Sequence, residues 1–187
     1  MDIWLIRHTS VAIEPGICYG RSEVALSDTF ENELNLLKPQ LPSHFDHIIS
    51  SPLERCTRLA GTFGEFDTDA RLLEYDFGDW EMSPWQAIDQ SILDQWMQNF
   101  THQPPPNGET LVAMQARIDD FLVNLRRQTH QQILIVTHAG VIRCIWAHVL
   151  QIPLAQIFKI HVGYGTVLRC SLGENPDHDI IYPANQQ

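Results

Sequence analysis

Residues 2–9, with the sequence DIWLIRHT, form an apolar run that ends abruptly in polar side chains. Residues 132–138, QILIVTH, repeat this pattern later in the chain. A short apolar run bounded in this way is typical of a strand that is buried on both faces of a parallel sheet. Open α/β sheets keep their functional residues at the carboxyl ends of such strands. We therefore expect a site where these two strands end.

Strands and helices alternate over most of the chain. A second short strand is predicted at residues 46–50, and a final strand, rich in β-branched and aromatic residues, at residues 163–172. Apolar residues recur at helical spacing in three further segments, residues 53–63, 110–127 and 140–150. This alternation predicts a layered α/β sheet.

The length of the chain suits a single domain, residues 1–187, with one sizeable core. Residues 82–106 differ in character, because large aromatic side chains stand among polar residues before a run of prolines. We predict that this segment is an insertion whose helices form a lid over one end of the sheet. Its aromatic residues, interpreted as core, are Trp85, Trp96 and Phe100. The polar residues 175–187 predict a flexible tail.

Composition and charge argue against several classes of protein. A formal net charge of −11 and the lack of a lysine-rich tract argue against nucleic-acid binding. No apolar run approaches the roughly 20 residues that cross a bilayer. The amino terminus shows no export signal, so we expect a cytoplasmic protein with no membrane partner. The four cysteines are widely spaced, which predicts free thiols rather than disulfides or a zinc site. No pattern in the sequence indicates an oligomeric state.

Four polar segments follow one another along the chain, and their combination is more informative than any one of them. They are residues 7–9 (RHT), 50–56 (SSPLERC), 73–81 (LEYDFGDWE) and 136–141 (VTHAGV). This ordered set resembles the histidine phosphatase superfamily, the phosphoglycerate-mutase-like enzymes, from Arg7 to about Arg143. The resemblance implies a three-layer α/β/α sandwich with a mostly parallel central sheet. It also implies a phosphomonoesterase that forms a phosphohistidine intermediate without a metal or an organic cofactor.

The residue types in these segments suit the transfer of a phosphoryl group. Such a transfer needs a nucleophile in line with the leaving oxygen and positive donors around the remaining phosphate oxygens. Arg7 and Arg55 offer planar, permanently charged guanidinium groups that match the geometry of a phosphate. Their charge also disfavours protonation of a neighbouring imidazole, so that His8, the expected nucleophile, would stay neutral near neutral pH.

Two further residues complete the predicted catalytic set. His138 would donate a hydrogen bond to the phosphate oxygens, and more strongly as charge builds up in the transition state. A leaving alkoxide needs a proton, and Glu74 is the candidate general acid and, in the next step, the base for water. Spacing alone hardly separates Glu74 from the other carboxylates of its segment, Asp76, Asp79 and Glu81. The resemblance favours Glu74, because the acid of the family occupies this loop.

Residues 18–26 (CYGRSEVAL) are similar to the subfamily of alpha-ribazole-5′-phosphate phosphatases. This similarity implies that Tyr19, Gly20 and Arg21 contact the substrate beyond its phosphate, although a turn before a capped helix explains the same segment equally well. The expected partner is a small phosphorylated metabolite, with alpha-ribazole-5′-phosphate as the first candidate. The alternatives are a broad-specificity phosphatase, a phosphoglycerate mutase, and a phosphate-binding or interaction module without catalysis.

Two positions depart from the family pattern, which has glycine after the nucleophilic histidine and asparagine in the loop that follows. Thr9 would narrow the approach to the phosphate. A carboxylate at Glu14 would repel a phosphate, so we assign Glu14 no role. Arg143 lies one turn into the helix after His138 and could face solvent as readily as the pocket, so it is left out of the predicted site.

Overall fold

The computed structural model describes residues 1–182 of the chain. Its strands are β1 (Asp2–Arg7), β2 (His47–Ser50), β3 (Asp67–Thr68), β4 (Gln132–Thr137), β5 (Val167–Ser171) and β6 (Ile180–Tyr182). Its α-helices are α1 (Phe30–Leu37), α2 (Glu54–Ala60), α3 (Gln90–Asn99), α4 (Leu111–Leu125) and α5 (Ala139–Leu150). Short 3₁₀ turns connect these elements, at η1 (Lys38–Gln40), η2 (Ala70–Leu72), η3 (Gly78–Trp80), η4 (Trp85–Ala87), η5 (Leu154–Lys159) and η6 (Pro176–His178). The strands and the longer helices predicted from the periodicity are therefore present, with shifted ends.

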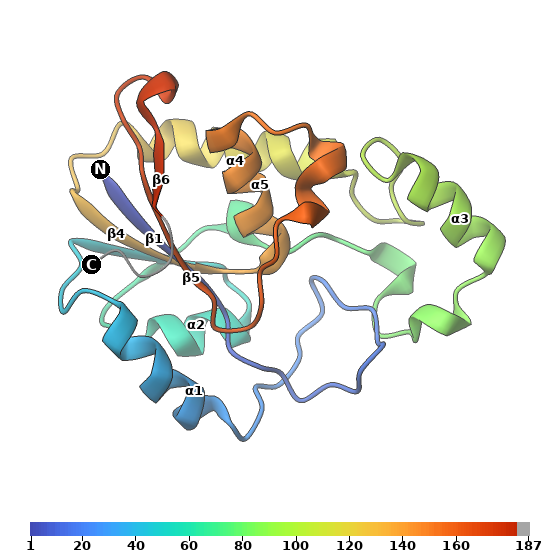
Figure 1. The fold of residues 1–187 in the computed structure, drawn as a ribbon. Helices are drawn as coiled ribbons and strands as arrows, with labels where there is room; N and C mark the ends of the chain where they lie inside the picture. Colours follow the sequence, from blue (N-terminus) through green and yellow to red (C-terminus); the bar gives the residue numbers. More distant parts are fainter. Residues whose placement is uncertain (183–187) are drawn as a thin grey trace.

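The strands form one sheet in the order β3-β2-β4-β1-β5-β6 (Figure 1). The first four strands in this order run parallel to one another. β5 runs antiparallel to β1, and β6 runs antiparallel to β5. This arrangement confirms the predicted mostly parallel sheet.

Helices cover both faces of the sheet. Successive residues of a strand point to opposite faces, so apolar residues in a row need a covering layer on each side. In β4, Ile133 and Ile135 belong to the apolar cluster built with α4 and α5. Leu134 and Val136 belong to a second cluster built with α1 and α2. Figure 1 shows α4 and α5 on one side of the sheet and α1 and α2 on the other. These layers confirm the α/β/α sandwich.

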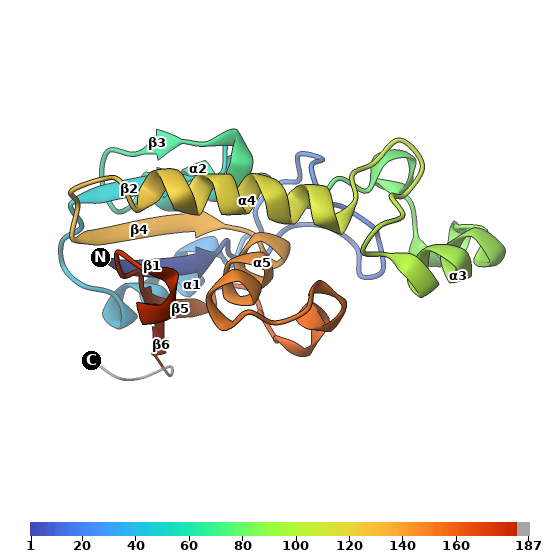
Figure 2. The same ribbon diagram turned by 90° about the horizontal axis from the view of Figure 1, so that it is seen from above.

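The register of the parallel strands brings their polar ends together at one edge of the sheet. Arg7 pairs with Thr137 across β1 and β4, so the next residues, His8 and His138, leave the sheet side by side. Ser50 pairs with Val136 across β2 and β4, which brings the β2 end to the same edge. In Figure 2, α3 and its flanking loops lie beyond this edge. Residues 82–106 thus contain a helix where one was predicted, while their role as a lid stays a prediction.

The carboxyl-terminal region differs from the expected flexible tail. Residues 176–178 form η6, and residues 180–182 form β6, which pairs with β5. Asp179 accepts hydrogen bonds from the Arg126 guanidinium and from the Gly173 amide, and these bonds tie the segment to the end of α4. The remaining part of the predicted tail, residues 183–187, lies outside the described residues. Within the described range, no helix is long and apolar enough to span a bilayer.

Candidate active site

His8 and His138 lie against each other at the edge where β1 and β4 end. Their ring centroids are 5.3 Å apart, with the planes inclined by 65°. Both side chains are buried. His138 Nε2 is hydrogen-bonded to Ser51 Oγ at 2.7 Å, so the residue after β2 fixes the second imidazole. The structure therefore brings together the two histidines that the strand endings predicted.

The hydrogen bonds of His8 define which ring nitrogen can attack. Nδ1 lies 2.8 Å from the carbonyl oxygen of Thr9. A carbonyl oxygen can only accept a hydrogen bond, so Nδ1 carries the proton and Nε2 carries the lone pair. Burial, together with the positive charge of Arg55, lowers the pKa of His8 to about 3. His8 is therefore a neutral base in the folded protein at physiological pH.

Arg7 and Arg55 are held by backbone carbonyl groups rather than by carboxylates. Arg7 Nη1 donates to the Val162 carbonyl at 2.8 Å, and Arg55 Nη1 donates to the Ser22 carbonyl at 2.8 Å. The Nε atoms of both arginines are buried and have no hydrogen-bond partner within the described part of the chain. A buried donor without a partner is costly, and the positive charges of both arginines act on His8, so these side chains suit an anion as partner.

Two tyrosines lie over these arginines. The Tyr164 ring lies 3.9 Å from the Arg7 guanidinium carbon, and the Tyr19 ring lies 5.6 Å from that of Arg55. The Tyr19 and Tyr164 hydroxyl groups are hydrogen-bonded to each other, so the two side chains form a bridge between Arg7 and Arg55. The prediction included Tyr19 but not Tyr164. Tyr164 lies in the turn before β5, within a segment that was predicted to be a strand.

Gly20 acts through its backbone. Its carbonyl accepts a hydrogen bond from Arg55 Nη2. A Cβ atom at Gly20 would lie 1.9 Å from the Tyr75 carbonyl oxygen, so a side chain does not fit there. Glycine is therefore required at this position by the close approach of the two loops, and it helps to position Arg55.

Glu74 is the carboxylate of its segment that contacts the start of α5. Its Oε2 accepts a hydrogen bond from the Gly140 amide at 3.1 Å, at the start of α5 and two residues after His138. A Cβ atom at Gly140 would lie 2.3 Å from Glu74 Oε1, so the glycine makes room for the carboxylate. The Thr137 hydroxyl donates to the Leu72 carbonyl and ties the Glu74 loop to the end of β4.

The other three carboxylates of the segment have separate tasks in the loops. Asp76 pairs with Arg21 at 3.3 Å. Glu81 accepts hydrogen bonds from the backbone amides of Arg21 and Ser22, which help to lower its pKa against the effect of burial. Asp79 is exposed and accepts a hydrogen bond from the Asn107 side chain. The geometry thus separates Glu74 from its neighbours, which the spacing of the sequence could not do.

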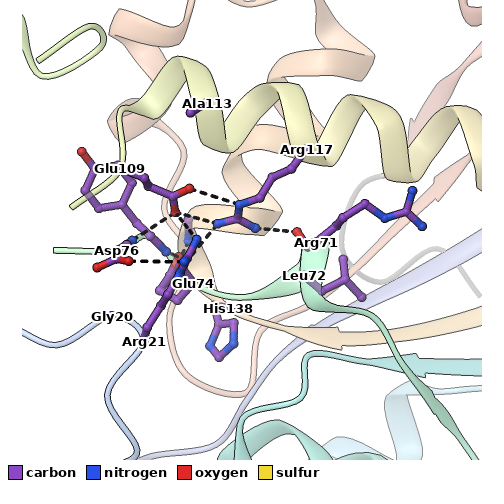
Figure 3. Close-up of polar contacts among 12 residues, drawn as sticks. Gly20, Arg21, Arg71, Leu72, Glu74, Asp76, Glu109, Ala113, Arg117 and His138 are labelled. Carbon is purple, nitrogen blue, oxygen red and sulfur yellow. Dashed lines mark hydrogen bonds and ion pairs between the residues drawn. The ribbon is translucent and has the colours of Figure 1, made fainter. Parts of the chain in front are cut away.

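Arg21 belongs to a network of charges behind Glu74 (Figure 3). Its guanidinium pairs with Glu109 at 3.1 Å and donates to the Glu74 carbonyl at 3.3 Å. Arg117 pairs with the same carboxylate at 2.8 Å and also donates to the Glu74 carbonyl. The structure therefore uses Arg21 to hold the Glu74 loop, and its contact with a substrate stays a prediction.

Arg143 lines a cavity together with Glu74 and Gly140. Residues 140 and 143 are separated by three positions and so share one face of α5. This helical spacing was the signal that could have placed Arg143 at the site. Glu14 is exposed in its loop, whereas Thr9 is fully buried and its hydroxyl has no hydrogen-bond partner among the residues that the structure describes. Among residues 1–182, no group of three or more histidine, cysteine or acidic side chains is arranged to hold a metal ion.

The fold and the comparisons together define the class of protein, a phosphoric monoester hydrolase with an α/β/α architecture. The profile of the Histidine phosphatase superfamily (branch 1) matches residues 3–176, and the chain belongs to this family.

Similar proteins and a similar solved structure support the assignment to the phosphatases. The chain is 29% identical over 177 residues to the Adenosylcobalamin/alpha-ribazole phosphatase of Escherichia coli K12, covering 88% of this chain and 87% of that protein. It is 25% identical over 170 residues to Phosphoserine phosphatase 1 of Hydrogenobacter thermophilus, covering 83% and 79%. The crystal structure of the alpha-ribazole phosphatase from Shigella flexneri superposes with a TM-score of 0.88 at 26% identity, covering 100% and 96%.

Proposed function

We propose that this phosphatase hydrolyses alpha-ribazole-5′-phosphate to alpha-ribazole and phosphate, through a phosphohistidine intermediate on His8. The observation that carries the mechanism is the neutral His8 beside two arginines whose buried Nε–H groups lack partners. A phosphate dianion would supply the missing acceptors for Arg7 and Arg55 and place phosphorus close to His8 Nε2.

In the first step, the lone pair of His8 Nε2 attacks phosphorus, and the bond between phosphorus and the ester oxygen breaks. Glu74 in its protonated form gives its proton to the leaving oxygen, so that the alcohol departs neutral. Arg7, Arg55 and His138 stabilise the charge that builds up on the transferred phosphate oxygens. The thiol of Cys56, 3.5 Å from His138 Nε2, packs against this imidazole on the side of the core.

In the second step, water replaces the alcohol. The Glu74 carboxylate takes a proton from the water as its oxygen attacks phosphorus, and the bond between phosphorus and His8 Nε2 breaks. Phosphate leaves, His8 regains its lone pair, and Glu74 is protonated again. The hydrogen bond from Nδ1 to the Thr9 carbonyl keeps His8 in the reactive tautomer in both steps.

The names of the relatives support the choice of substrate. The similarity to alpha-ribazole phosphatases covers 88% of the chain in sequence and 100% of it in structure. The match to a phosphoserine phosphatase favours a second candidate, phosphoserine. Phosphoserine and alpha-ribazole-5′-phosphate share a phosphate on a primary alcohol and differ in the remainder of the leaving group.

The test is kcat/KM for alpha-ribazole-5′-phosphate, phosphoserine, 3-phosphoglycerate and p-nitrophenyl phosphate, with His8→Ala as the control. We expect a preference for the ribazole ester of about a hundredfold over the other esters, which corresponds to about 2.7 kcal/mol of discrimination in the transition state. Similar, low values for all four esters would contradict the substrate assignment but leave the mechanism standing. A preference for phosphoserine would establish the second candidate.

A further inference from the structure

The turn before β5 packs against the residues at the end of β1. Residues 163–166 form this turn, and Gly165 has a φ of 62°, in the left-handed region that glycine adopts easily. The Gly165 amide donates to the His8 carbonyl at 3.2 Å, and the Arg7 amide donates to the Thr166 carbonyl at 3.1 Å. The turn is therefore fixed to the backbone of two of the predicted catalytic residues.

Tyr164, the second residue of this turn, contacts the same two residues through its ring. The Arg7 guanidinium carbon lies over the ring, 3.9 Å from its centre, a distance at which the two flat groups touch. The centre of the ring lies 5.6 Å from that of the His8 imidazole. A cation is attracted to the face of an aromatic ring. The Tyr164 ring therefore limits the orientations that the Arg7 guanidinium can adopt.

The segment before β5 holds the Arg7 side chain at one further point. Nη1 donates to the Val162 carbonyl at 2.8 Å, which is the one hydrogen bond of this side chain within residues 1–182. Arg7 is only partly buried, whereas Arg55 is fully buried. Fixing an exposed arginine side chain on a ligand costs conformational entropy. A contact that already restricts Arg7 in the free protein lowers this cost when a phosphate binds.

The Tyr164 hydroxyl connects this arginine to the second one. It is hydrogen-bonded to the Tyr19 hydroxyl, and the Tyr19 ring lies 5.6 Å from the Arg55 guanidinium carbon. The residue after Tyr19, Gly20, accepts a hydrogen bond from Arg55 Nη2. Through the two tyrosines, Arg7 is therefore connected to Arg55. Two guanidinium groups that bind one phosphate must stand at a distance that matches the anion.

We propose that Tyr164 is a positioning residue, which orients the Arg7 guanidinium for the phosphate and, through Tyr19, fixes its distance from Arg55. The inference rests on the proposed function, since it takes Arg7 as a group that binds the phosphate. Tyr164 acts on the phosphoryl group, whereas Glu74 acts on the leaving group. The contribution of Tyr164 is therefore the same for every ester.

The first test is the affinity for orthovanadate, an oxyanion that resembles phosphate and has no leaving group. Tyr164→Leu removes both the aromatic face and the hydroxyl. We expect it to raise the dissociation constant of orthovanadate, measured by calorimetry, at least about tenfold. It should lower kcat/KM for alkyl phosphates and for p-nitrophenyl phosphate by factors that agree within about twofold. A dissociation constant within about twofold of that of the unmodified protein would overturn the proposal.

Tyr164→Leu should keep its fold, because Tyr164 is 40% exposed and lies in a turn. The matched control is Tyr182→Leu. The Arg169 guanidinium carbon lies 4.3 Å from the centre of the Tyr182 ring, so the same kind of contact joins β5 and β6. This variant should bind orthovanadate as the unmodified protein does. A loss as large as that in Tyr164→Leu would overturn the specific role of Tyr164.

A second measurement asks whether Tyr164 acts through Arg7. Arg7→Lys keeps the positive charge but removes the planar guanidinium. In this background, Tyr164→Leu should change the dissociation constant of orthovanadate by less than about threefold, because the group that Tyr164 orients is gone. Equal losses with and without the Arg7 guanidinium would overturn the proposal.

The link to Arg55 is tested by removing the hydroxyl groups alone. Tyr164→Phe and Tyr19→Phe each break the bond between the two rings, so each should weaken orthovanadate binding about threefold. The double variant should lose no more than either single variant, since the same bond is absent from all three. Losses that multiply would overturn the connection through Tyr19.

The outcomes separate this inference from the proposed function. If Arg7→Ala abolishes turnover and orthovanadate binding while Tyr164→Leu changes neither, the proposed function stands and the role of Tyr164 is overturned. If no ester is turned over in a His8-dependent way, the proposed function fails. The orthovanadate titrations need no turnover, so a loss in Tyr164→Leu that depends on Arg7 would still support the positioning role, and the lack of such a loss would overturn it.

Discussion

Glu74 and His8 are the two residues on which the proposed mechanism depends most, and a hydrogen bond to the backbone holds each side chain in place. Glu74 accepts a hydrogen bond from the Gly140 amide in the first turn of α5. His8 donates a hydrogen bond from its Nδ1–H to the Thr9 carbonyl. The sequence predicted both residues. It did not indicate Tyr164, because the contact of Tyr164 with Arg7 joins residues far apart in the chain and has no local pattern.

The role of Glu74 as general acid predicts a dependence on the leaving group. Glu74→Gln should lower kcat for alkyl phosphates, whose alkoxides need a proton, by at least about a hundredfold. The same variant should lower kcat for p-nitrophenyl phosphate by less than about tenfold, because p-nitrophenolate leaves without protonation. Steady-state kinetics with the two kinds of ester measure this difference. An equal loss with both esters would argue against an acid role for Glu74.

The lowered pKa of His8 predicts a loss of stability in acid. The pKa falls from 6.5 in the unfolded chain to about 3 in the folded protein, so the unfolded state binds a proton first as the pH falls. The contribution of His8 to the free energy of unfolding is therefore complete above the pKa of the unfolded chain, and it decreases as the pH falls from about 6.5 towards 3. At pH 5 the loss from His8 amounts to about 2 kcal/mol.

Urea denaturation between pH 8 and pH 4.5 measures this contribution. His8→Asn should flatten the decline in the free energy of unfolding over this range. His44→Asn is the control, because the His44 side chain is 82% exposed at the opposite end of the sheet, and it should leave the decline in place. An unchanged slope in His8→Asn would mean that His8 is not buried as a neutral base.

At the scale of secondary-structure elements, the longer segments were predictable and the short ones were not. The apolar periodicity of α4 and α5 identifies a buried helical face, and the apolar run of β4 identifies a buried strand. β3 and β6 have two and three residues, too few to show any period. The predicted last strand began too early, because residues 163–166 form a turn before β5 starts, and this turn places Tyr164 against Arg7 and His8.

The Glu109 carboxylate joins α4 to the Glu74 loop and gives a prediction at this scale. Besides Arg21 and Arg117, it accepts a hydrogen bond from the Asp76 amide. Glu109→Gln leaves two guanidinium groups without their counter-charge and loosens the loop, so kcat for alkyl phosphates should fall about tenfold with little change in KM.

This positioning role has a specific signature. Hydrolysis of p-nitrophenyl phosphate, which does not need the acid, should be less affected in Glu109→Gln, and Glu109→Asp should recover part of the lost rate. Glu31→Gln, on the exposed side of α1, is the matched control and should behave as the unmodified protein. Equal losses for both esters would show that the network supports the fold in general rather than the placement of Glu74.

At the scale of the whole molecule, the layered architecture followed from the alternation of strands and helices together with the family resemblance. The strand order did not follow from the pattern, since it depends on which edges pair across long stretches of chain. Nor did the packing of the last residues, because their polar composition gives no sign of the ion pair between Asp179 and Arg126. The Asp179 side chain is only 1% exposed in that pair.

This ion pair predicts that the carboxyl-terminal segment contributes to stability. Asp179→Ala leaves the largely buried Arg126 without its counter-charge and should lower the free energy of unfolding by about 3 kcal/mol. Asp177→Ala, two residues earlier and exposed, should change it by less than about 0.5 kcal/mol. Thermal and urea denaturation measure both values. Similar stabilities for the two variants would contradict the packing of this segment.

The most direct measurement of the central claim is the position of the phosphoryl group during turnover. The protein is mixed with substrate, quenched in alkali to preserve phosphohistidine, digested, and analysed by mass spectrometry. We predict one phosphorylated peptide, which contains residues 7–9 and carries the group on His8, and we predict neither phosphopeptide nor turnover in His8→Ala. Turnover that persists in His8→Ala, or a phosphoryl group on another side chain, would contradict the account.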